Sequence, residues 1–244
     1  MKNREILKGK NCLITGATGG IGSSIANALL DIGCNVFLTA RDKKRLDAIC
    51  QNSVNRASKK SITVTGMPCD LSRLDEINSL INSVNRSFST VDILINCAGL
   101  FPVATVEETT IEDFDKCFAV NVRAPFILSK KVIPEMVING WGRVVNIGSS
   151  SAYNGFPGTS VYCASKNGLL GLSRSLFHEF KGENVRVFSI SPGSAQTPMG
   201  EKVLNQDYAT FIDPKEIAEY LVDVISYDGN MISEEIRLNR ILVQ

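Results

Sequence analysis

The chain has 244 residues, with 26 Lys and Arg against 25 Asp and Glu, so its formal net charge is +1. Its 44% hydrophobic and 21% charged content excludes an intrinsically disordered protein. The balanced charge gives no global attraction to nucleic acid or to an anionic membrane, and no apolar run is long enough to span a bilayer. The seven cysteines form no CxxC pair, and the chain contains a single histidine. We therefore expect a cytoplasmic protein with no disulfide framework and no metal site.

Short runs rich in β-branched residues alternate along the chain with longer amphipathic segments. The runs are 12–15, 36–39, 62–65, 91–95, 143–147 and 185–190, and helical spacing is found over 21–32, 74–84, 161–180 and 215–225. This alternation predicts an α/β fold with a doubly wound, Rossmann-like parallel sheet in a single domain over residues 1–244. A (β/α)₈ barrel is the alternative at this length. Residues 194–212 show no clear periodicity and are predicted to form a lid over a functional site.

A glycine-rich turn follows the first predicted strand and opens the first predicted helix. It reads Thr15-Gly-Ala-Thr-Gly-Gly-Ile-Gly22. Its glycines allow a tight turn and a close approach of the backbone to a phosphate, and the N-terminus of the helix attracts a pyrophosphate. Between a strand and a helix, this turn predicts dinucleotide binding rather than a merely flexible loop.

Tyr162 and Lys166 lie four residues apart in the predicted helix 161–180 and so share one face of it. An ammonium beside a phenol favours the phenolate, which would lower the pKa of Tyr162 toward working pH. A tyrosine tuned in this way can donate or accept the proton that moves when a hydride moves. Taken alone, however, such a pair is more often an ordinary surface pair.

The GxxxGxG spacing of the turn and the order of later segments resemble the short-chain dehydrogenase/reductase family, over residues 10 to about 225. The matching segments are Asp70, Asn96-Cys97-Ala98-Gly99, Asn121, Ser149, Tyr162-Cys-Ala-Ser-Lys166 and Pro192-Gly193. The resemblance implies an oxidoreductase that transfers a hydride between a nicotinamide cofactor and a small-molecule carbonyl or secondary alcohol. It also implies that no metal is required.

The resemblance implies four catalytic residues. Ser149, 13 residues before the tyrosine, would hydrogen-bond the substrate carbonyl, with Ser150 as the alternative. Tyr162 would be the general acid/base, and Lys166 would lower its pKa and bind the nicotinamide ribose. Asn121 would hold a water molecule that links Lys166 to solvent.

The end of the second predicted strand favours NADP(H), with NAD(H) as the alternative. The position that is acidic in NAD-dependent members falls on Ala40, and Arg41 follows where NADP-dependent members carry arginine. Asp42 would restore an NAD reading if the register slipped, and Gly19 stands where many NADP-dependent members have a basic residue. Asp70 is expected to accept a hydrogen bond from the adenine amino group. The implied cofactor contacts are Gly16, Thr18, Gly19, Gly20, Ile21, Gly22, Arg41, Asp70, Leu71, Asn96, Ala98, Gly99, Tyr162, Lys166, Pro192, Gly193 and Thr197.

The sequence gives a less specific signal for the residues that bind the substrate. Candidates for a moderately apolar pocket are Phe101, Pro102, Val103, Ser151, Tyr153, Phe156, Ser194 and Met199. A 3-oxoacyl-[acyl-carrier-protein] reductase or a 3-hydroxy-acid dehydrogenase is an alternative within the family, and a non-catalytic dinucleotide-binding sensor is an alternative of another class. By resemblance, the helices around 105–138 and 162–180 would pair into a homodimer or homotetramer.

Overall fold

The computed structural model describes residues 4–57, 62–203 and 206–241. Its centre is a seven-stranded sheet in the order β3-β2-β1-β4-β5-β6-β7, in which every neighbouring pair is parallel. The strands are β1 (Asn11–Thr15), β2 (Asn35–Ala40), β3 (Val64–Pro68), β4 (Ile93–Asn96), β5 (Gly142–Ile147), β6 (Val185–Pro192) and β7 (Glu235–Leu238). This open sheet confirms the doubly wound α/β prediction and excludes the barrel.

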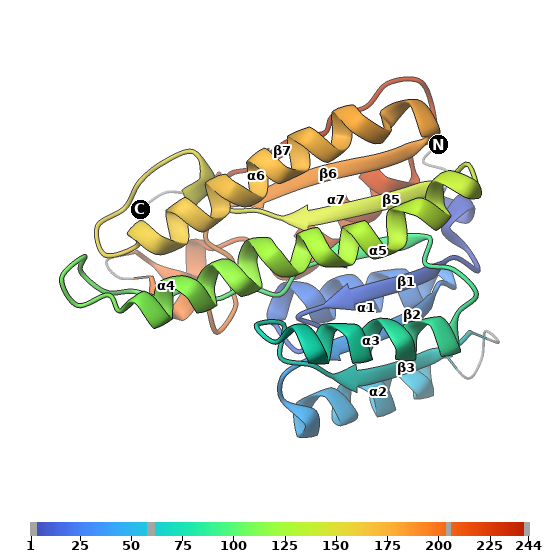
Figure 1. The fold of residues 1–244 in the computed structure, drawn as a ribbon, viewed down its shortest axis with the longest axis horizontal. Coiled ribbons are helices and arrows are strands. Elements are labelled where there is room, and N and C mark those ends of the chain that lie inside the picture. The colour runs from blue at the N-terminus through green and yellow to red at the C-terminus, as the bar shows by residue number, and fades with distance from the viewer. Residues whose placement is uncertain (1–3, 58–61, 204–205, 242–244) are drawn as a thin grey trace.

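Helices cover both faces of the sheet, as Figure 1 shows. The helices are α1 (Gly20–Ile32), α2 (Lys43–Ala57), α3 (Leu74–Ser87), α4 (Ile111–Phe118), α5 (Ala124–Ile138), α6 (Ser160–Phe180) and α7 (Pro214–Ser226). One apolar core joins α1, the first turn of α2 and α7 to one face, and a second core joins α3, α5 and α6 to the other. Because both faces are covered, the central strands are buried along most of their length, which explains their hydrophobic runs.

The observed strands differ from the predicted ones at both edges of the sheet and at β4. β3 begins at Val64 rather than at Ile62 and ends at Pro68, and β4 runs from Ile93 to Asn96. Six strand runs were predicted, and β7 was not among them. Its four residues, Glu235–Leu238, alternate charged and apolar side chains at the sheet edge, so they carry no long apolar signal.

The order of the strands creates a crevice at one end of the sheet. The chain moves outward from β1 through β2 to β3, then returns to β4 on the other side of β1. The helices that follow β1 and β4 therefore diverge to opposite faces. Ligands of open α/β sheets bind outside the carboxyl ends of the strands at such a switch point.

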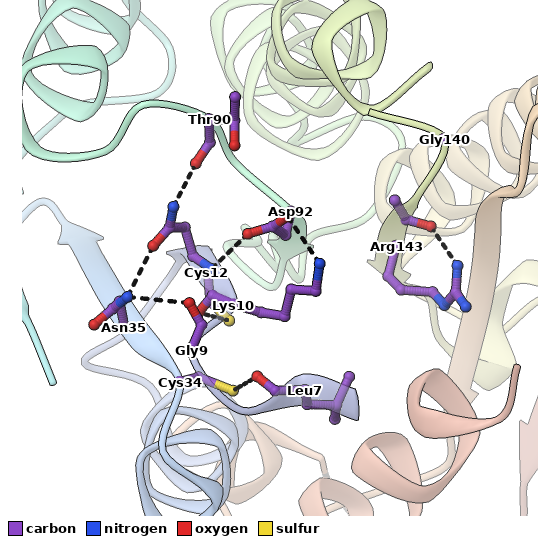
Figure 2. Close-up of polar contacts among 12 residues, drawn as sticks. Leu7, Gly9, Lys10, Cys12, Cys34, Asn35, Thr90, Asp92, Gly140 and Arg143 are labelled. Carbon is purple, nitrogen blue, oxygen red and sulfur yellow. Dashed lines mark hydrogen bonds and ion pairs between the residues drawn. The ribbon is translucent and has the colours of Figure 1, made fainter. Parts of the chain in front are cut away.

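The opposite end of the sheet is closed by polar contacts (Figure 2). Lys10 Nζ lies 3.4 Å from Asp92 Oδ1, and the Asp92 carboxylate also accepts a hydrogen bond from the backbone nitrogen of Asn11 at 2.8 Å. Trp141, the only tryptophan, lies between two cations, with the Lys10 ammonium and the Arg143 guanidinium each 4.3 Å from its ring centroid. These contacts fix the strand ends far from the crevice.

Candidate active site

A pocket of about 910 Å³ opens at the carboxyl ends of the central strands. It is lined by the glycine-rich turn after β1, the end of β2, the loops after β4, β5 and β6, and the first two turns of α6. The pocket therefore lies at the switch point of the sheet. Among the described residues, no group of three or more His, Cys, Asp or Glu is arranged to hold a metal ion.

The glycine-rich turn is shaped for close approach. Gly16 has φ +67°, and a Cβ atom there would lie 2.7 Å from the Cα of Ala98 in the loop after β4. A Cβ on Gly22 would overlap the carbonyl oxygen of Gly16. The N-cap of α1 is Gly19, which offers no side chain to the first N–H groups of the helix. The residues of this first turn line the pocket, and free N–H groups at a helix N-terminus are suited to bind an anion.

Three polar side chains predicted to be catalytic meet on the other side of the pocket. Ser149 follows β5, and Tyr162 and Lys166 come from the first two turns of α6. The Ser149 hydroxyl faces the Tyr162 phenol closely enough to lower its pKa. Lys166 Nζ donates to the carbonyl oxygen of Ile147 at 2.8 Å and lies 5.7 Å from the centroid of the Tyr162 ring. Ser149, and not the alternative Ser150, makes the contact with the tyrosine.

Burial sets the pKa of both titratable groups. Burial raises the pKa of Tyr162 to about 12, and the Ser149 hydroxyl only partly offsets it. Burial also lowers the pKa of Lys166 to about 8. The expectation that Lys166 lowers the pKa of Tyr162 is therefore wrong for this structure, because the cost of burying a phenolate outweighs an ammonium that points to a backbone carbonyl.

Asn121 lies in a π-helical turn, Ala119–Arg123, that joins α4 to α5. Its side chain is fully committed to neighbours: Oδ1 accepts from the backbone nitrogen of Leu100 at 2.8 Å, and Nδ2 donates to the Leu100 carbonyl at 3.0 Å and to Ser165 Oγ at 2.9 Å. The two bonds to Leu100 hold the loop after β4 against the π-helical turn, and the bond to Ser165 ties this turn to α6, which carries Lys166. Asn121 itself does not line the pocket.

Two arginines border the pocket where β2 ends. Arg41 follows β2 and Arg45 lies in the first turn of α2. Arg45 Nη2 donates to the carbonyl oxygen of Thr18 in the glycine-rich turn at 3.0 Å. Arg45 therefore brings a positive charge to this turn, although position 19 is a glycine and not a basic residue. Asp42 instead caps α2, where its Oδ1 accepts from the backbone nitrogen of Arg45 at 3.0 Å, and it does not line the pocket.

Two of the predicted cofactor contacts lie outside the pocket lining. The Asp70 carboxylate accepts from the nitrogen and hydroxyl of Ser72 at 2.9 and 2.8 Å. Burial raises the pKa of Asp70, but the bonds from Ser72 and the charge of Arg41 outweigh it and lower the pKa. Asn96 is buried, and its Nδ2 donates to Asn146 Oδ1 at 2.8 Å. The other contacts predicted for the cofactor all line the pocket.

The substrate end of the pocket is mostly apolar. Six of the candidates predicted for it line the pocket, namely Phe101, Val103, Ser151, Phe156, Ser194 and Met199. The Phe101 ring packs edge-to-face on Tyr162, with 4.7 Å between centroids. Pro102 and Tyr153 do not line the pocket, and the Tyr153 ring instead lies 4.1 Å from the Arg237 guanidinium.

The sequence did not single out several residues that line the pocket. Arg45 belongs to the basic cluster Arg41 to Arg45, which the sequence indicates as positive charge near the cofactor, but its contact with the glycine-rich turn was not predicted. Cys97, in the Asn96–Gly99 motif, also lines the pocket, as do Lys202 and Gln206. No local pattern marks Lys202 and Gln206, which come from the segment after β6.

The family model described as short chain dehydrogenase matches residues 10–208. The chain belongs to the short-chain dehydrogenase family. The residues that carried the resemblance in the sequence lie within this match. Among the described residues, this family member has no helix both long and apolar enough to cross a membrane.

Curated relatives of this short-chain dehydrogenase include enzymes with two different names. A 3-oxoacyl-[acyl-carrier-protein] reductase of Rickettsia conorii is 32% identical over 214 residues, which cover 88% of this chain and 84% of the relative. A D-beta-hydroxybutyrate dehydrogenase of Rhizobium meliloti is 36% identical over 193 residues, which cover 79% of this chain and 74% of the relative.

Solved structures share the whole fold. A metagenomic short-chain oxidoreductase in complex with NADP has a TM-score of 0.83 and 29% identity, covering 96% of this chain and 99% of that one. A 3-oxoacyl (acyl-carrier-protein) reductase from Agrobacterium tumefaciens with NADP bound has a TM-score of 0.85 and 26% identity, covering 98% and 97%. Structural relatives of this chain thus bind NADP.

Proposed function

We propose that this short-chain dehydrogenase is an NADP(H)-dependent oxidoreductase that interconverts a small-molecule carbonyl compound and its secondary alcohol. The observation that carries the proposal is the meeting of Ser149, Tyr162 and Lys166 in one pocket with the glycine-rich turn. A sensor that only binds a dinucleotide has no need of a serine that faces a tyrosine beside a buried lysine.

We propose a role for each side chain. Because the pKa of Tyr162 is raised to about 12, its phenol carries a proton at neutral pH and can donate it to a carbonyl oxygen during reduction. Ser149 can donate a hydrogen bond to the same oxygen and stabilise its developing negative charge. The bound nicotinamide would supply the hydride. Lys166, buried behind the tyrosine, can hold the cofactor ribose and replace the proton that Tyr162 loses.

Asn121 supports the pocket wall through its contacts with the loop after β4 and with α6. The proton relay expected for it remains a prediction, and it would need a group other than its carboxamide, which Leu100 and Ser165 occupy. Through these bonds Asn121 positions the loop after β4, where Ala98 and Gly99 border the pocket.

A preference for NADP(H) over NAD(H) is supported by the charges at the end of β2. Arg41 and Arg45 border the pocket there, and the residue at the end of the strand, Ala40, offers no carboxylate to repel a 2′-phosphate. Asp42, the basis of the NAD alternative, is used to cap α2. The first N–H groups of α1 would hold the pyrophosphate.

The proposed substrate is a simple ketone or aldehyde, with a 3-oxo compound as the alternative. The apolar walls formed by Phe101, Val103, Phe156 and Met199 favour a substrate with an apolar substituent. Self-association is also proposed, because Phe114, Phe126 and Ile111 are exposed on α4 and α5 and Phe118 stacks on Phe114 at 4.5 Å. The expected cytoplasmic location remains a prediction.

The experiment that tests the proposed function follows the absorbance of NADPH and NADH with a panel of ketones, aldehydes and 3-oxo esters. We expect oxidation of NADPH in preference to NADH and a loss of about 10²-fold or more in kcat on Ser149→Ala. Tight binding of NADPH with no turnover across the panel would favour the sensor alternative instead.

A further inference from the structure

The chain beyond β7 runs beside the loop that follows β6. β6 and β7 pair from Ser189 to Pro192, and the backbone nitrogen of Gly193 donates to the carbonyl oxygen of Leu238 at 2.8 Å. Both strands therefore end at the pocket. Arg240 lies two residues beyond Leu238, at the level where the loop after β6 forms part of the pocket wall.

Arg240 makes three contacts with residues 206–212, which we call the rim segment. Its Nη2 donates to Gln206 Oε1 at 2.8 Å, and its Nη1 donates to Thr210 Oγ1 at 3.0 Å. Its guanidinium carbon lies 5.0 Å from the centroid of the Phe211 ring. A planar guanidinium can make two such bonds and stack at the same time, which an ammonium cannot do.

The two ends of the rim segment are held differently. At its base, Ile212 donates from its backbone nitrogen to the Ser194 carbonyl at 3.0 Å and accepts from the backbone nitrogen of Gln196 at 2.9 Å. Phe211, beside this base, is buried. The far end, at Gln206, is exposed and is held through its side chain. Arg240 thus connects the chain that follows β7 to the exposed end of the rim segment.

The contacts of Gln206 fix the direction of its amide. Its Oε1 accepts from both Arg240 Nη2 and Ser194 Oγ, at 2.8 and 3.2 Å. Both donors therefore bond to the amide oxygen, and the two N–H groups of the Gln206 amide remain available to donate to another acceptor. Within the described part of the chain, Nε2 makes no hydrogen bond, while Gln206 lines the pocket.

We propose that Arg240 is a positioning residue that holds Gln206 at the pocket rim so that its amide donates to a second acceptor oxygen of the substrate. The substrate class is then a carbonyl compound with a further carbonyl, ester or carboxylate oxygen, rather than a plain ketone. This inference rests on the proposed function for its substrate, but not for the contacts of Arg240.

The test compares Arg240→Ala, Arg240→Lys and Gln206→Ala with the wild type. The matched control is Arg174→Ala, because Arg174 also anchors β7, through Glu235 at 2.8 Å, but does not touch the rim segment. The substrates are ethyl 3-oxobutanoate and 2-octanone, which are similar in size but differ in the second oxygen. Hydrogen exchange at the amides of Thr210 and Phe211 gives a readout independent of activity.

We expect Arg240→Ala and Gln206→Ala to raise KM for the 3-oxo ester by about 10-fold and to change KM for 2-octanone by less than about 2-fold. Arg240→Lys should recover part of this loss, since it keeps one donor. Exchange at Thr210 and Phe211 should be faster by about 10-fold in Arg240→Ala and unchanged in Arg174→Ala.

Equal losses on both substrates, or equal effects of Arg240→Ala and Arg174→Ala, would overturn the proposal. If the wild type reduces neither compound with either nucleotide, the proposed function is wrong for this substrate class. The exchange measurement then still decides the role of Arg240, because unchanged protection of the rim segment in Arg240→Ala rejects it.

Discussion

The ammonium of Lys166 lies 5.7 Å from the ring centroid of Tyr162 and points to the carbonyl oxygen of Ile147, 2.8 Å away. Both side chains are buried in the pocket wall, so burial governs their protonation more than their mutual interaction does. At neutral pH the tyrosine therefore holds its proton, and the lysine is the group that titrates closest to the working range.

The first prediction concerns the pH dependence of ketone reduction. Because burial lowers the pKa of Lys166 to about 8, kcat/KM should fall as pH rises through about 8, while Tyr162, with a pKa of about 12, stays protonated. Lys166→Arg should remove this limb, because arginine keeps its charge. A pH profile of kcat/KM checks this, and an unchanged limb in Lys166→Arg would assign the titration to another group.

The second prediction concerns stability. The folded-state pKa of Lys166, about 8, lies below the reference value of 10.5, so the charged lysine disfavours folding. Lys166→Met should raise the free energy of unfolding at pH 7 by about 1–3 kcal/mol. Between pH 8 and 10.5 the unfolded chain keeps this proton and the folded chain does not, so the gain should shrink with rising pH. Urea unfolding at pH 7 and pH 10 measures it, and an equal gain at both pH values would contradict the account.

The third prediction concerns nucleotide preference. Arg45 reaches the glycine-rich turn and borders the pocket, so Arg45→Ala should weaken NADPH binding by about 10-fold and NADH binding by less than about 2-fold. Lys44→Ala is the control, because Lys44 is exposed on the same helix but does not line the pocket. Calorimetric titration with both nucleotides measures these changes in affinity. Equal weakening of both would mean that Arg45 only supports the turn.

The fourth prediction concerns the end of the sheet opposite the pocket. Arg143 is fully buried and bonded to Asp228 as well as to the backbone carbonyl of Ile225 at 3.1 Å. Asp228→Ala should reduce the free energy of unfolding by about 1–3 kcal/mol, because a buried cation loses its partner. Asp75→Ala breaks an exposed pair with Arg73 and should cost less than about 1 kcal/mol. The fluorescence of Trp141, stacked beside Arg143, reports both transitions, and equal losses would contradict the role of burial.

The sheet and the order of the site motifs could be predicted from the sequence, because both depend on local patterns. The apolar runs of β1, β5 and β6 and the helix 161–180 were located to within two residues. Ser149, Tyr162 and Lys166 were placed in one site by their order along a known family pattern. In contrast, β7 was missed, because an edge strand with alternating charged residues lacks an apolar run.

What the sequence could not give are interactions between distant segments. The raised pKa of Tyr162 depends on burial, and burial depends on how α6 packs over the loops, not on the Tyr162–Lys166 spacing. Asp70 and Asn96, expected at the cofactor, do not line the pocket; Oδ1 of Asp70 accepts from Ser72, and Nδ2 of Asn96 donates to Asn146. Arg240 reaches Gln206 across 34 residues of sequence, and no periodic pattern reveals such a contact.

The central claim is that the Tyr162 phenol transfers the proton in the reaction. The most direct test compares Tyr162→Phe with Tyr220→Phe, which removes an exposed hydroxyl on α7 far from the pocket lining. We expect Tyr162→Phe to lower kcat by about 10³-fold or more while NADPH still binds, and Tyr220→Phe to change neither kcat nor the Kd for NADPH. Full activity in a folded, NADPH-binding Tyr162→Phe enzyme would contradict it.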